Sequence, residues 1–307
     1  MQLSAREVAI GKWPGILAEL GLDKAFLTGK HCSCPSCGGV DRFRFDDKGG
    51  TGSSFCSHCG ASDGFGLLMK VKGIDFQTAA KEVERVAGVV KKVAIRAGKT
   101  DAEKAKALRR LWLESKPVTH GDPVCHYLNE RGISSPDSKA LRYHPDLLYS
   151  EGGESGRYPA MLALVSSPNG AGASIHRTYL KDGSKAPVSK PKKMMTGLPI
   201  SGAAVRLFPV APVLGIAEGI ETALMAAQRF AIPVWSAVSA QGMESWVCPE
   251  GVEEVVIFGD NDKSWTGQKA AYVLAYKLHE KGIHVRVEIP GHTFDESMMG
   301  VDWADLK

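Results

Sequence analysis

The sequence predicts an α/β protein in three parts: a small cysteine-rich module, a basic middle region of mixed structure and a C-terminal domain with a mainly parallel sheet. Five of the seven cysteines fall within residues 32–59. Residues 156–208 alternate short apolar runs with Gly, Pro, Asn and Asp turn signals. From residue 211 onward, strand-like apolar runs alternate with helical stretches, a pattern typical of a parallel sheet.

The elements can be predicted in order. Residues 5–29 form a short helical lead-in, and residues 74–88 form a helix that ends at Gly88. Residues 89–100 are a basic linker, and a helix restarts over residues 101–112 with Asp101 as its N-cap. The remaining strands are "YPAMLALV", "ASIHRTYL" (joined by "SSPNGAG"), "VLGIAE", "PVWSAV", "EEVVIF" and "HVRVEI", and the remaining helices are "ETALMAAQRF" and "GQKAAYVLAYKLHEKG".

Length and composition restrict the class of protein. A chain of 307 residues with 44% apolar residues has room for two or three domains with real cores. No run approaches the roughly 18 apolar residues of a membrane span. The N-terminus mixes charges among its apolar residues, unlike a secretory signal. We therefore expect a cytoplasmic protein with no membrane partner, in which clustered cysteines bind metal rather than form disulfides.

Charge is unevenly distributed along the chain. Residues 1–100 carry 15 Lys+Arg against 10 Asp+Glu, and residues 101–210 carry 16 against 10. Residues 211–307 carry 7 Lys+Arg against 14 Asp+Glu. The two basic segments favour a polyanionic partner, and an acidic segment that handles a polyanion needs cations.

The cysteine cluster contains two C-x-x-C pairs, Cys34/Cys37 and Cys56/Cys59. Zinc prefers four tetrahedral thiolate or imidazole ligands, and each pair presents two sulfurs from one tight turn. The spacing predicts a zinc ribbon that holds one structural Zn²⁺. The spare candidates nearby are His31, Cys32 and His58, and two further cysteines, Cys125 and Cys248, are isolated.

Between the pairs, Arg42, Phe43, Arg44 and Phe45 alternate charge and aromatic ring. On a strand, this pattern places the arginines on one face and the rings on the other. Arginines can bind phosphates and aromatic rings can stack on unpaired bases, so the face is a candidate nucleic-acid contact. The alternative is that the rings pack on the zinc knuckles and the arginines are merely solvated.

Acidic residues follow two of the C-terminal strands. Glu218 and Gly219 end "VLGIAEG", and Asp260 and Asp262 end "VVIFGDND". Ligands of parallel α/β sheets bind beyond the carboxyl ends of strands, and three converging carboxylates need a hard cation. The pattern predicts a Mg²⁺ or Mn²⁺ site, with Gly219 allowing a tight turn beside it. The alternative is that the acids are N-caps or turn residues.

The stretch "AGKT" (97–100) ends like a phosphate-binding P-loop. That loop requires G-x-x-x-x-G-K-[ST], and position 93 is Val. The sequence therefore does not predict a P-loop NTPase here.

With these motifs in place, residues 213–289 resemble a toprim domain, the fold shared by topoisomerases, bacterial-type primases and some nucleases. Its Glu and D-x-D motifs map onto Glu218, Asp260 and Asp262, which the resemblance implies are catalytic and bind metal. Asp302 and Trp303 are similar to a C-terminal feature of phage-type members. Bacterial primases carry an Asp four residues after the motif Glu, where this chain has Thr222, preceded by Glu221.

Residues 30–66, with "CPSCGGVDRFRF" and "FCSHCGASDGF", resemble the zinc-binding domain of phage and plasmid primases. The region before the toprim domain is similar to the part that precedes toprim in the same proteins. The resemblance implies four segments: a zinc-binding domain (1–88), a basic linker and helix (89–115), the basic N-terminal part of a polymerase region (116–210) and a toprim catalytic domain (211–307). His176 is expected to be structural. The expected nucleic-acid or nucleotide contacts are Arg42, Arg44, Arg177, Lys185, Lys192, Lys193 and Lys263.

The resemblance implies a phage- or plasmid-type DNA primase, a DNA-directed RNA polymerase that makes short RNA primers de novo from NTPs on single-stranded DNA. Its zinc domain would recognise the template, and a replicative helicase would be supplied by another chain. The alternatives are a toprim nuclease and a non-catalytic, zinc-dependent module that binds single-stranded DNA in replication. A topoisomerase would need a tyrosine on a separate large domain, for which the chain has no obvious room.

Overall fold

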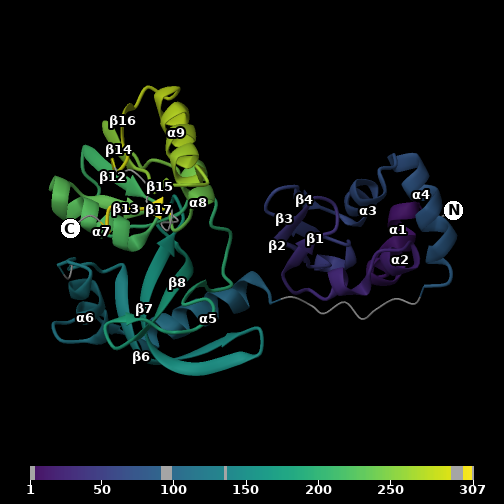
Figure 1. Cartoon of the computed structure of the whole chain (residues 1–307), viewed down its shortest axis with the longest axis horizontal. Coiled ribbons are helices and arrows are strands. Elements are labelled where there is room, and N and C mark those ends of the chain that lie inside the picture. The colour runs from purple at the N-terminus through teal and green to yellow at the C-terminus, as the bar shows by residue number, and fades with distance from the viewer. Residues whose placement is uncertain (1–3, 91–98, 135–136, 292–299, 306–307) are drawn as a thin grey trace. The chain divides into compact units, whose positions relative to one another are not determined.

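The computed structural model describes residues 4–90, 99–134, 137–291 and 300–305. The chain divides into two compact units, residues 1–99 and 100–307 (Figure 1). Among the described residues, no helix has both the length and the apolar character needed to cross a bilayer.

The first unit combines short helices with a small antiparallel sheet. The sheet has the order β1-β2-β3-β4. Its core joins the two parts, since Phe43 and Phe45 of the sheet are buried in one cluster with Trp13 and Phe65, whose ring centroids lie 4.8 Å apart. The elements are α1 (Ala5–Ala9), α2 (Trp13–Glu19), η1 (Lys24–Leu27), β1 (Cys32–Cys34), β2 (Gly38–Phe45), η2 (Lys48–Gly50), β3 (Ser54–Cys56), β4 (Gly60–Ser62), α3 (Gly64–Lys72) and α4 (Phe76–Ala87).

The second unit is built on one sheet of 11 strands with the order β10-β8-β7-β11-β13-β12-β14-β16, to which β5, β6 and β9 attach. Its first elements are α5 (Asp101–Glu114), β5 (Lys116–Pro117), α6 (Pro123–Glu130), β6 (Leu141–Glu151), β7 (Glu154–Ser166), β8 (Gly172–Lys181), β9 (Ser184–Lys185), β10 (Lys192–Met194) and β11 (Ala204–Val205). These strands pair antiparallel.

The C-terminal part of the sheet is parallel, as the alternating pattern predicts. Strands β13, β12, β14 and β16 pair in parallel. The elements are β12 (Val213–Ala217), α7 (Ile220–Phe230), β13 (Val234–Ser236), α8 (Ala240–Ser245), β14 (Glu254–Phe258), β15 (Asn261–Asp262), α9 (Thr266–His279), β16 (His284–Glu288) and β17 (Gly300–Val301). The short pair β15–β17 lies beside the turn after β14.

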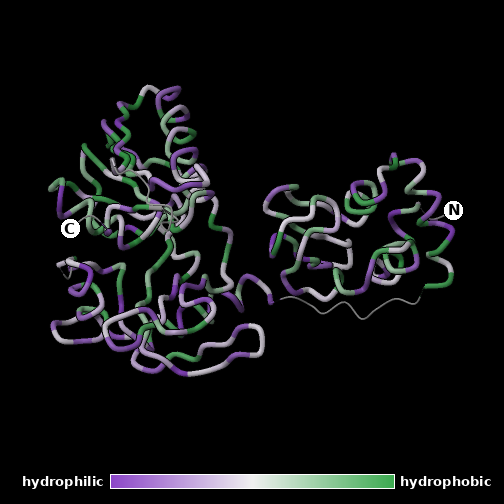
Figure 2. Tube along the Cα trace, viewed as in Figure 1, coloured by the Kyte–Doolittle hydropathy of each residue, from purple (hydrophilic) through white to green (hydrophobic). Residues whose placement is uncertain are grey.

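Alternating side chains of the parallel strands pack on helices at both faces. Val256 and Phe258 lie in one core cluster with residues of α7, whereas Val255 and Ile257 lie in another with residues of α9. Hydrophobic segments accordingly recur through the strands and helices (Figure 2). A strand buried on both faces reads as a continuous apolar run, which explains "EVVIF" and "VLGIA".

The start of α5 differs by one residue from the prediction. The N-cap of α5 is Thr100, not Asp101, because the Thr100 hydroxyl accepts from the Glu103 amide while the Glu103 carboxylate accepts from the Thr100 amide. Most of the predicted linker, residues 91–98, lies outside the described residues.

Candidate active site

The four cysteines of the two C-x-x-C pairs come together in the first unit. Their sulfur atoms all lie within 4.8 Å of one another, with Cys34 to Cys59 at 4.0 Å and Cys37 to Cys56 at 3.8 Å. A tetrahedron with Zn–S bonds of about 2.3 Å has its sulfurs roughly 3.8 Å apart, so the cluster fits Zn²⁺.

The knuckle around Cys56 favours a thiolate. The amides of His58 and Cys59 each donate to Cys56 Sγ at 3.4 Å. Burial raises the pKa of the Cys56 thiol, but these two donors and the neighbouring sulfurs outweigh it and bring the pKa to about 7. Cys32 lies outside the four-sulfur group, and its thiol contacts the Phe43 carbonyl at 3.8 Å.

Strand β2 places its aromatic and basic side chains on opposite faces. Phe43 and Phe45 are buried, Arg42 is exposed and Arg44 is half-buried. The rings belong to the core and are not available for stacking on bases, which corrects that part of the expectation. Arg44 is paired with Asp46 at 2.5 Å. The predicted phosphate contacts of Arg42 and Arg44 stay predictions.

The second unit holds a cavity of about 190 Å³ at the carboxyl ends of the parallel strands. Acidic and basic side chains face each other in it. Its lining comes from both the parallel strands and the antiparallel region before them: Arg131, His176, Lys185, Lys192, Glu218, Gly219, Ile220, Glu221, Thr222, Val238, Asp260 and Asp302.

Asp260 is the most perturbed carboxylate of this cavity. Burial, then the neighbouring carboxylates Glu218, Asp302 and Asp262, raise its pKa to about 8. Its Oδ1 is buried and has no hydrogen-bond partner among the described residues. The pKa of Glu218 is also raised, first by burial. A buried, unpartnered carboxylate oxygen among further carboxylates fits a hard divalent cation, which these residues can hold.

Asp262 and Asn261 shape the turn between β14 and α9. The Asp262 carboxylate accepts from the amides of Thr266 and Gly267, each at 3.0 Å, and so caps α9. Asn261 donates to the Pro290 carbonyl and accepts from Gln268, both at 2.8 Å. Asn261 therefore ties the acidic turn to the neighbouring elements, a role that the sequence did not reveal.

Gly267 is a site residue that the sequence analysis missed. A Cβ at this position would lie 2.7 Å from the Asp260 carbonyl oxygen and 3.2 Å from Asp262 Oδ2. We expect Gly267→Ala to push the acidic turn away from α9, lowering the affinity for Mn²⁺ about tenfold or more and the free energy of unfolding by about 1–3 kcal/mol. Isothermal titration with Mn²⁺ and urea unfolding measure both. An alanine variant with wild-type Mn²⁺ affinity would contradict this packing.

Gly219 lies in the two-residue turn between β12 and α7. The tight turn is present, but Gly219 has φ −85° and ψ 157°, an extended conformation open to any residue, so its backbone does not require a glycine. Asp302 lines the cavity. The adjacent Trp303 is buried with its ring centroid 5.3 Å from that of Phe230 and 5.8 Å from that of Phe258, which anchors Asp302 beside the acidic turn.

Glu221 has both carboxylate oxygens engaged. Oε1 accepts from the Tyr127 hydroxyl at 2.6 Å, and Oε2 pairs with Lys192 Nζ at 2.9 Å. Burial acts to raise its pKa, but the Lys192 ammonium and the Tyr127 hydroxyl outweigh it and lower the pKa to about 2. The residue is therefore a charged, fully partnered carboxylate.

Arg131, at the end of α6, is a second residue that the sequence analysis missed. It lines the cavity, and its buried Nε has no hydrogen-bond partner in the part of the chain that the structure describes. A polar, charged run at a helix end, "NERG", was the available signal, but nothing local says which way its arginine points. Lys185 lines the same cavity, and its pKa is lowered, first by burial and then by Lys192.

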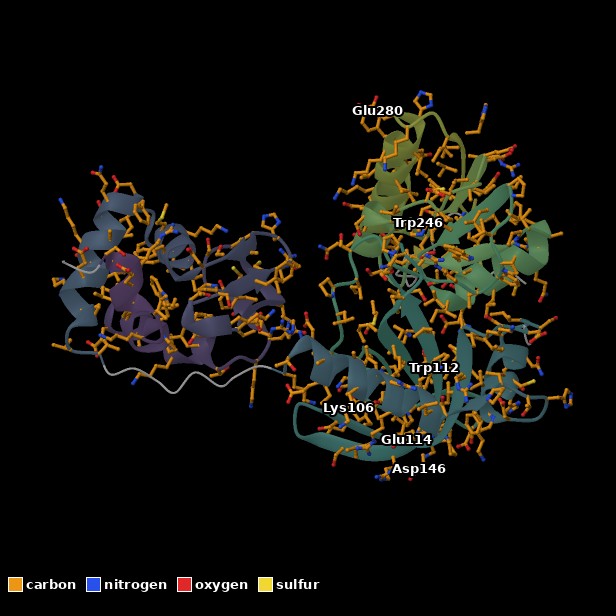
Figure 3. The ribbon with its side chains drawn as sticks, turned by 180° about the vertical axis from the view of Figure 1, so that it is seen from behind. Lys106, Trp112, Glu114, Asp146, Trp246 and Glu280 are labelled. Atoms are coloured by element: carbon orange, nitrogen blue, oxygen red, sulfur yellow. The ribbon has the colours of Figure 1, made fainter. Side chains whose placement is uncertain are left out.

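Strand β8 separates His176 from Arg177. His176 faces the cavity, and its Nδ1 has no hydrogen-bond partner within the described part of the chain. Burial lowers the pKa of His176 to about 4, so the imidazole is neutral near pH 7. Arg177 lines a different cavity against α5, together with Lys106 and Glu114 (labelled in Figure 3), and donates to the Met194 carbonyl at 3.3 Å. The structure does not bring Arg177 to the carboxylates, and its predicted template or triphosphate contact stays a prediction.

The last two predicted contacts also lie outside the cavity lining. Lys193 pairs with Glu151 at 2.6 Å, on the opposite side of β10 from Lys192. Lys263 is exposed in the turn after Asp262. Their roles toward nucleic acid stay predictions.

A larger cavity, of about 550 Å³, lies near the ends of α7. The described residues that line it, which include Phe208, Leu224 and Ile232, carry no charged side chain. It therefore lacks the groups needed for chemistry on charged substrates.

Comparison with known families identifies three segments. Residues 29–65 match the family described as zinc-binding domain of primase-helicase, and residues 213–307 match the toprim domain. Residues 102–207 match a domain of unknown function (DUF7146).

Three solved structures are similar over much of the chain. The Aquifex aeolicus primase (zinc binding and RNA polymerase domains) is 15% identical, covering 96% of this chain and 81% of that one, with a TM-score of 0.44. A DNA primase domain from Pseudomonas aeruginosa is 15% identical, covering 66% and 73%, with a TM-score of 0.43. The primase fragment of the bacteriophage T7 primase-helicase protein is 18% identical, covering 84% and 88%, with a TM-score of 0.37. Similarities at this level do not by themselves determine an activity.

The two family matches with a described role agree with the geometry. The four-cysteine cluster lies within or at the strands of residues 29–65, and the carboxylates Glu218, Asp260 and Asp302 lie within residues 213–307. In domain content and order, the chain thus matches a phage-type primase with an N-terminal zinc-binding domain and a C-terminal toprim domain.

Proposed function

We propose that the chain is a DNA primase that joins ribonucleoside triphosphates de novo on a single-stranded DNA template. The observation that carries the proposal is the cavity in which Glu218, Asp260 and Asp302 face Lys185, Lys192 and Arg131. Carboxylates that suit a divalent cation, set opposite fixed positive charges, are the groups that a triphosphate substrate requires.

In the proposed reaction, the 3′ hydroxyl of one nucleotide attacks the α-phosphate of the next, forming a phosphodiester bond and releasing pyrophosphate. Glu218, Asp260 and Asp262 would hold Mg²⁺ or Mn²⁺. A divalent cation bound there would lower the pKa of the attacking hydroxyl and neutralise the leaving group.

The chain's own cations would bind the triphosphate. Arg131 presents a buried Nε that no described residue hydrogen-bonds, and Lys185 lies in the same lining. His176, neutral at pH 7, can orient a hydrogen bond but supplies no charge. The N-terminal zinc ribbon, with Arg42 exposed on it, would bind the template. A replicative helicase would act together with this chain.

The test is primer synthesis on a library of single-stranded DNA templates with labelled NTPs and Mg²⁺. We expect short, template-dependent RNA that disappears when NTPs or Mg²⁺ are omitted. A parallel reaction contains labelled single strands and Mg²⁺ without NTPs. Efficient cutting there, with no primer made, would replace the primase by a toprim nuclease; template binding without either product would leave a non-catalytic module.

A further inference from the structure

Lys192 connects two parts of the second unit. It lies on β10, at the end of the sheet order, where it pairs with Thr178 of β8. Its Nζ nevertheless donates to Glu221 Oε2 on α7 at 2.9 Å, and both residues line the carboxylate cavity. The ammonium is therefore held inside the cluster by a residue of the toprim domain.

Glu221 leaves little room for another ligand. Its side chain is 4% exposed, and its second oxygen accepts from Tyr127 at 2.6 Å. Burying a carboxylate requires a compensating charge, and removal of one partner from such a pair is strongly destabilising. Here the compensating charge comes from the protein itself.

The ammonium also acts on the neighbouring carboxylates. Lys192 lines the same cavity as Glu218, Asp260 and Asp302, so its positive charge lies among these carboxylates. Four carboxylates, from Glu218, Glu221, Asp260 and Asp302, line one cavity of about 190 Å³. Their mutual repulsion is thus partly neutralised by a cation that the chain carries.

We propose that the Lys192 ammonium takes the place of an auxiliary divalent cation at Glu221, so that the carboxylate cavity binds one divalent cation where it would otherwise bind two. Glu221 is then a positioning residue that holds Lys192, not a metal ligand. The inference rests on the proposed function only because the same cavity would hold the catalytic cation.

The number of Mn²⁺ ions that bind to the zinc-loaded protein tests this inference. It can be measured by titration calorimetry and by electron paramagnetic resonance of the free Mn²⁺. Mn²⁺ ions that also bind to the Asp260→Asn variant are counted as bound outside the carboxylate cavity. We expect one Mn²⁺ at the site in the wild type. Lys192→Gln keeps a hydrogen-bond donor for Glu221 but removes the charge; it should bind a second Mn²⁺ or bind the first roughly tenfold more tightly. Lys192→Gln/Glu221→Gln should return to one.

Lys193→Gln is the matched control, because Lys193 follows Lys192 on the same strand but pairs with Glu151 outside the cavity. It should bind Mn²⁺ as the wild type does. Two site-bound Mn²⁺ in the wild type, or a Lys192→Gln isotherm identical to it, overturns the inference. The number of Mn²⁺ ions bound to the wild type can be measured whether or not the variants fold. Mn²⁺ binding is measured without nucleotides, so it does not depend on primer synthesis. If the protein makes primers but fails the Mn²⁺ test, only the inference about Lys192 is wrong. If it makes no primers, the measured number of bound Mn²⁺ ions still tests that inference.

Discussion

Asp260→Asn is expected to reduce primer synthesis by about 10³-fold or more while stabilising the metal-free protein at alkaline pH. The activity falls because the amide offers a weaker, neutral ligand where a buried carboxylate oxygen has no hydrogen-bond partner among residues 4–90, 99–134, 137–291 and 300–305. The measurement is the rate of labelled NTP incorporation on single-stranded DNA, at saturating Mg²⁺.

The stability of the metal-free protein rises in Asp260→Asn because the substitution removes a buried charge. The pKa of Asp260 is raised from 3.8 to about 8, mainly by burial. Between these values the folded metal-free protein holds a proton that the unfolded chain has lost, so stability is full below about pH 4 and falls as pH rises toward 8. Asparagine removes this loss, and at pH 8 the free energy of unfolding should rise by an amount on the order of a few kcal/mol.

Urea unfolding of the zinc-loaded protein from pH 5 to pH 9, first without added divalent cations other than zinc and then with Mn²⁺, measures the effect. Asp182→Asn, on the exposed turn after β8, is the control and should change neither activity nor the pH slope. A variant that keeps wild-type activity would show that Asp260 does not bind the catalytic cation. A variant whose stability falls with pH as steeply as that of the wild type would show that Asp260 does not carry the buried charge.

Cys56→Ser is expected to release the zinc ion and unfold the ribbon. The four sulfurs lie within 4.8 Å of one another, and small sheets of this kind depend on the metal. Structural zinc contributes about 10–16 kcal/mol of apparent binding free energy at pH 7. Zinc content by a chromogenic chelator should fall from one ion per chain to none, and hydrogen exchange should become fast over residues 32–62.

Cys32→Ser is the matched control, since Cys32 lies on β1 but outside the four-sulfur group. It should keep one zinc ion and slow exchange in the ribbon. A Cys56→Ser protein with full zinc content would mean that another residue completes the shell, and loss of zinc in Cys32→Ser would assign the site to a different set of cysteines.

Much of the fold follows from local patterns. The alternation of apolar runs and helices predicts the parallel strands β12, β13, β14 and β16, and these strands are parallel in the structure. The alternating "RFRF" correctly predicts that the two rings share one face of β2, but the rings join the core, as in the alternative interpretation, instead of facing a ligand. Such features depend on periods of two or four residues, which a sequence displays directly.

The site was less accessible to this reasoning. The acidic residues could be placed because strand ends are recognisable, and Lys185 and Lys192, also named from the sequence, line the same cavity, but the residue of β8 that faces the carboxylates could not be chosen. Arg177 was singled out, yet its neighbour His176 faces the carboxylates and Arg177 faces α5. Which of two adjacent strand residues points to a given face depends on the pairing of β8 with β7 and β10, and a shift by one residue exchanges them.

By itself, the sequence determined the zinc ribbon, the alternation of strands and helices and the strand ends at which Glu218 and Asp260 lie, because each depends on residues close together in the chain. Only the tertiary structure decided that Lys192 pairs with Glu221 and that Arg131 lines the same cavity. Lys192 and Glu221 are 29 residues apart and lie on different elements. Their contact exists because the antiparallel strands and the parallel strands form one sheet, and its register brings β10 and α7 to the same cavity.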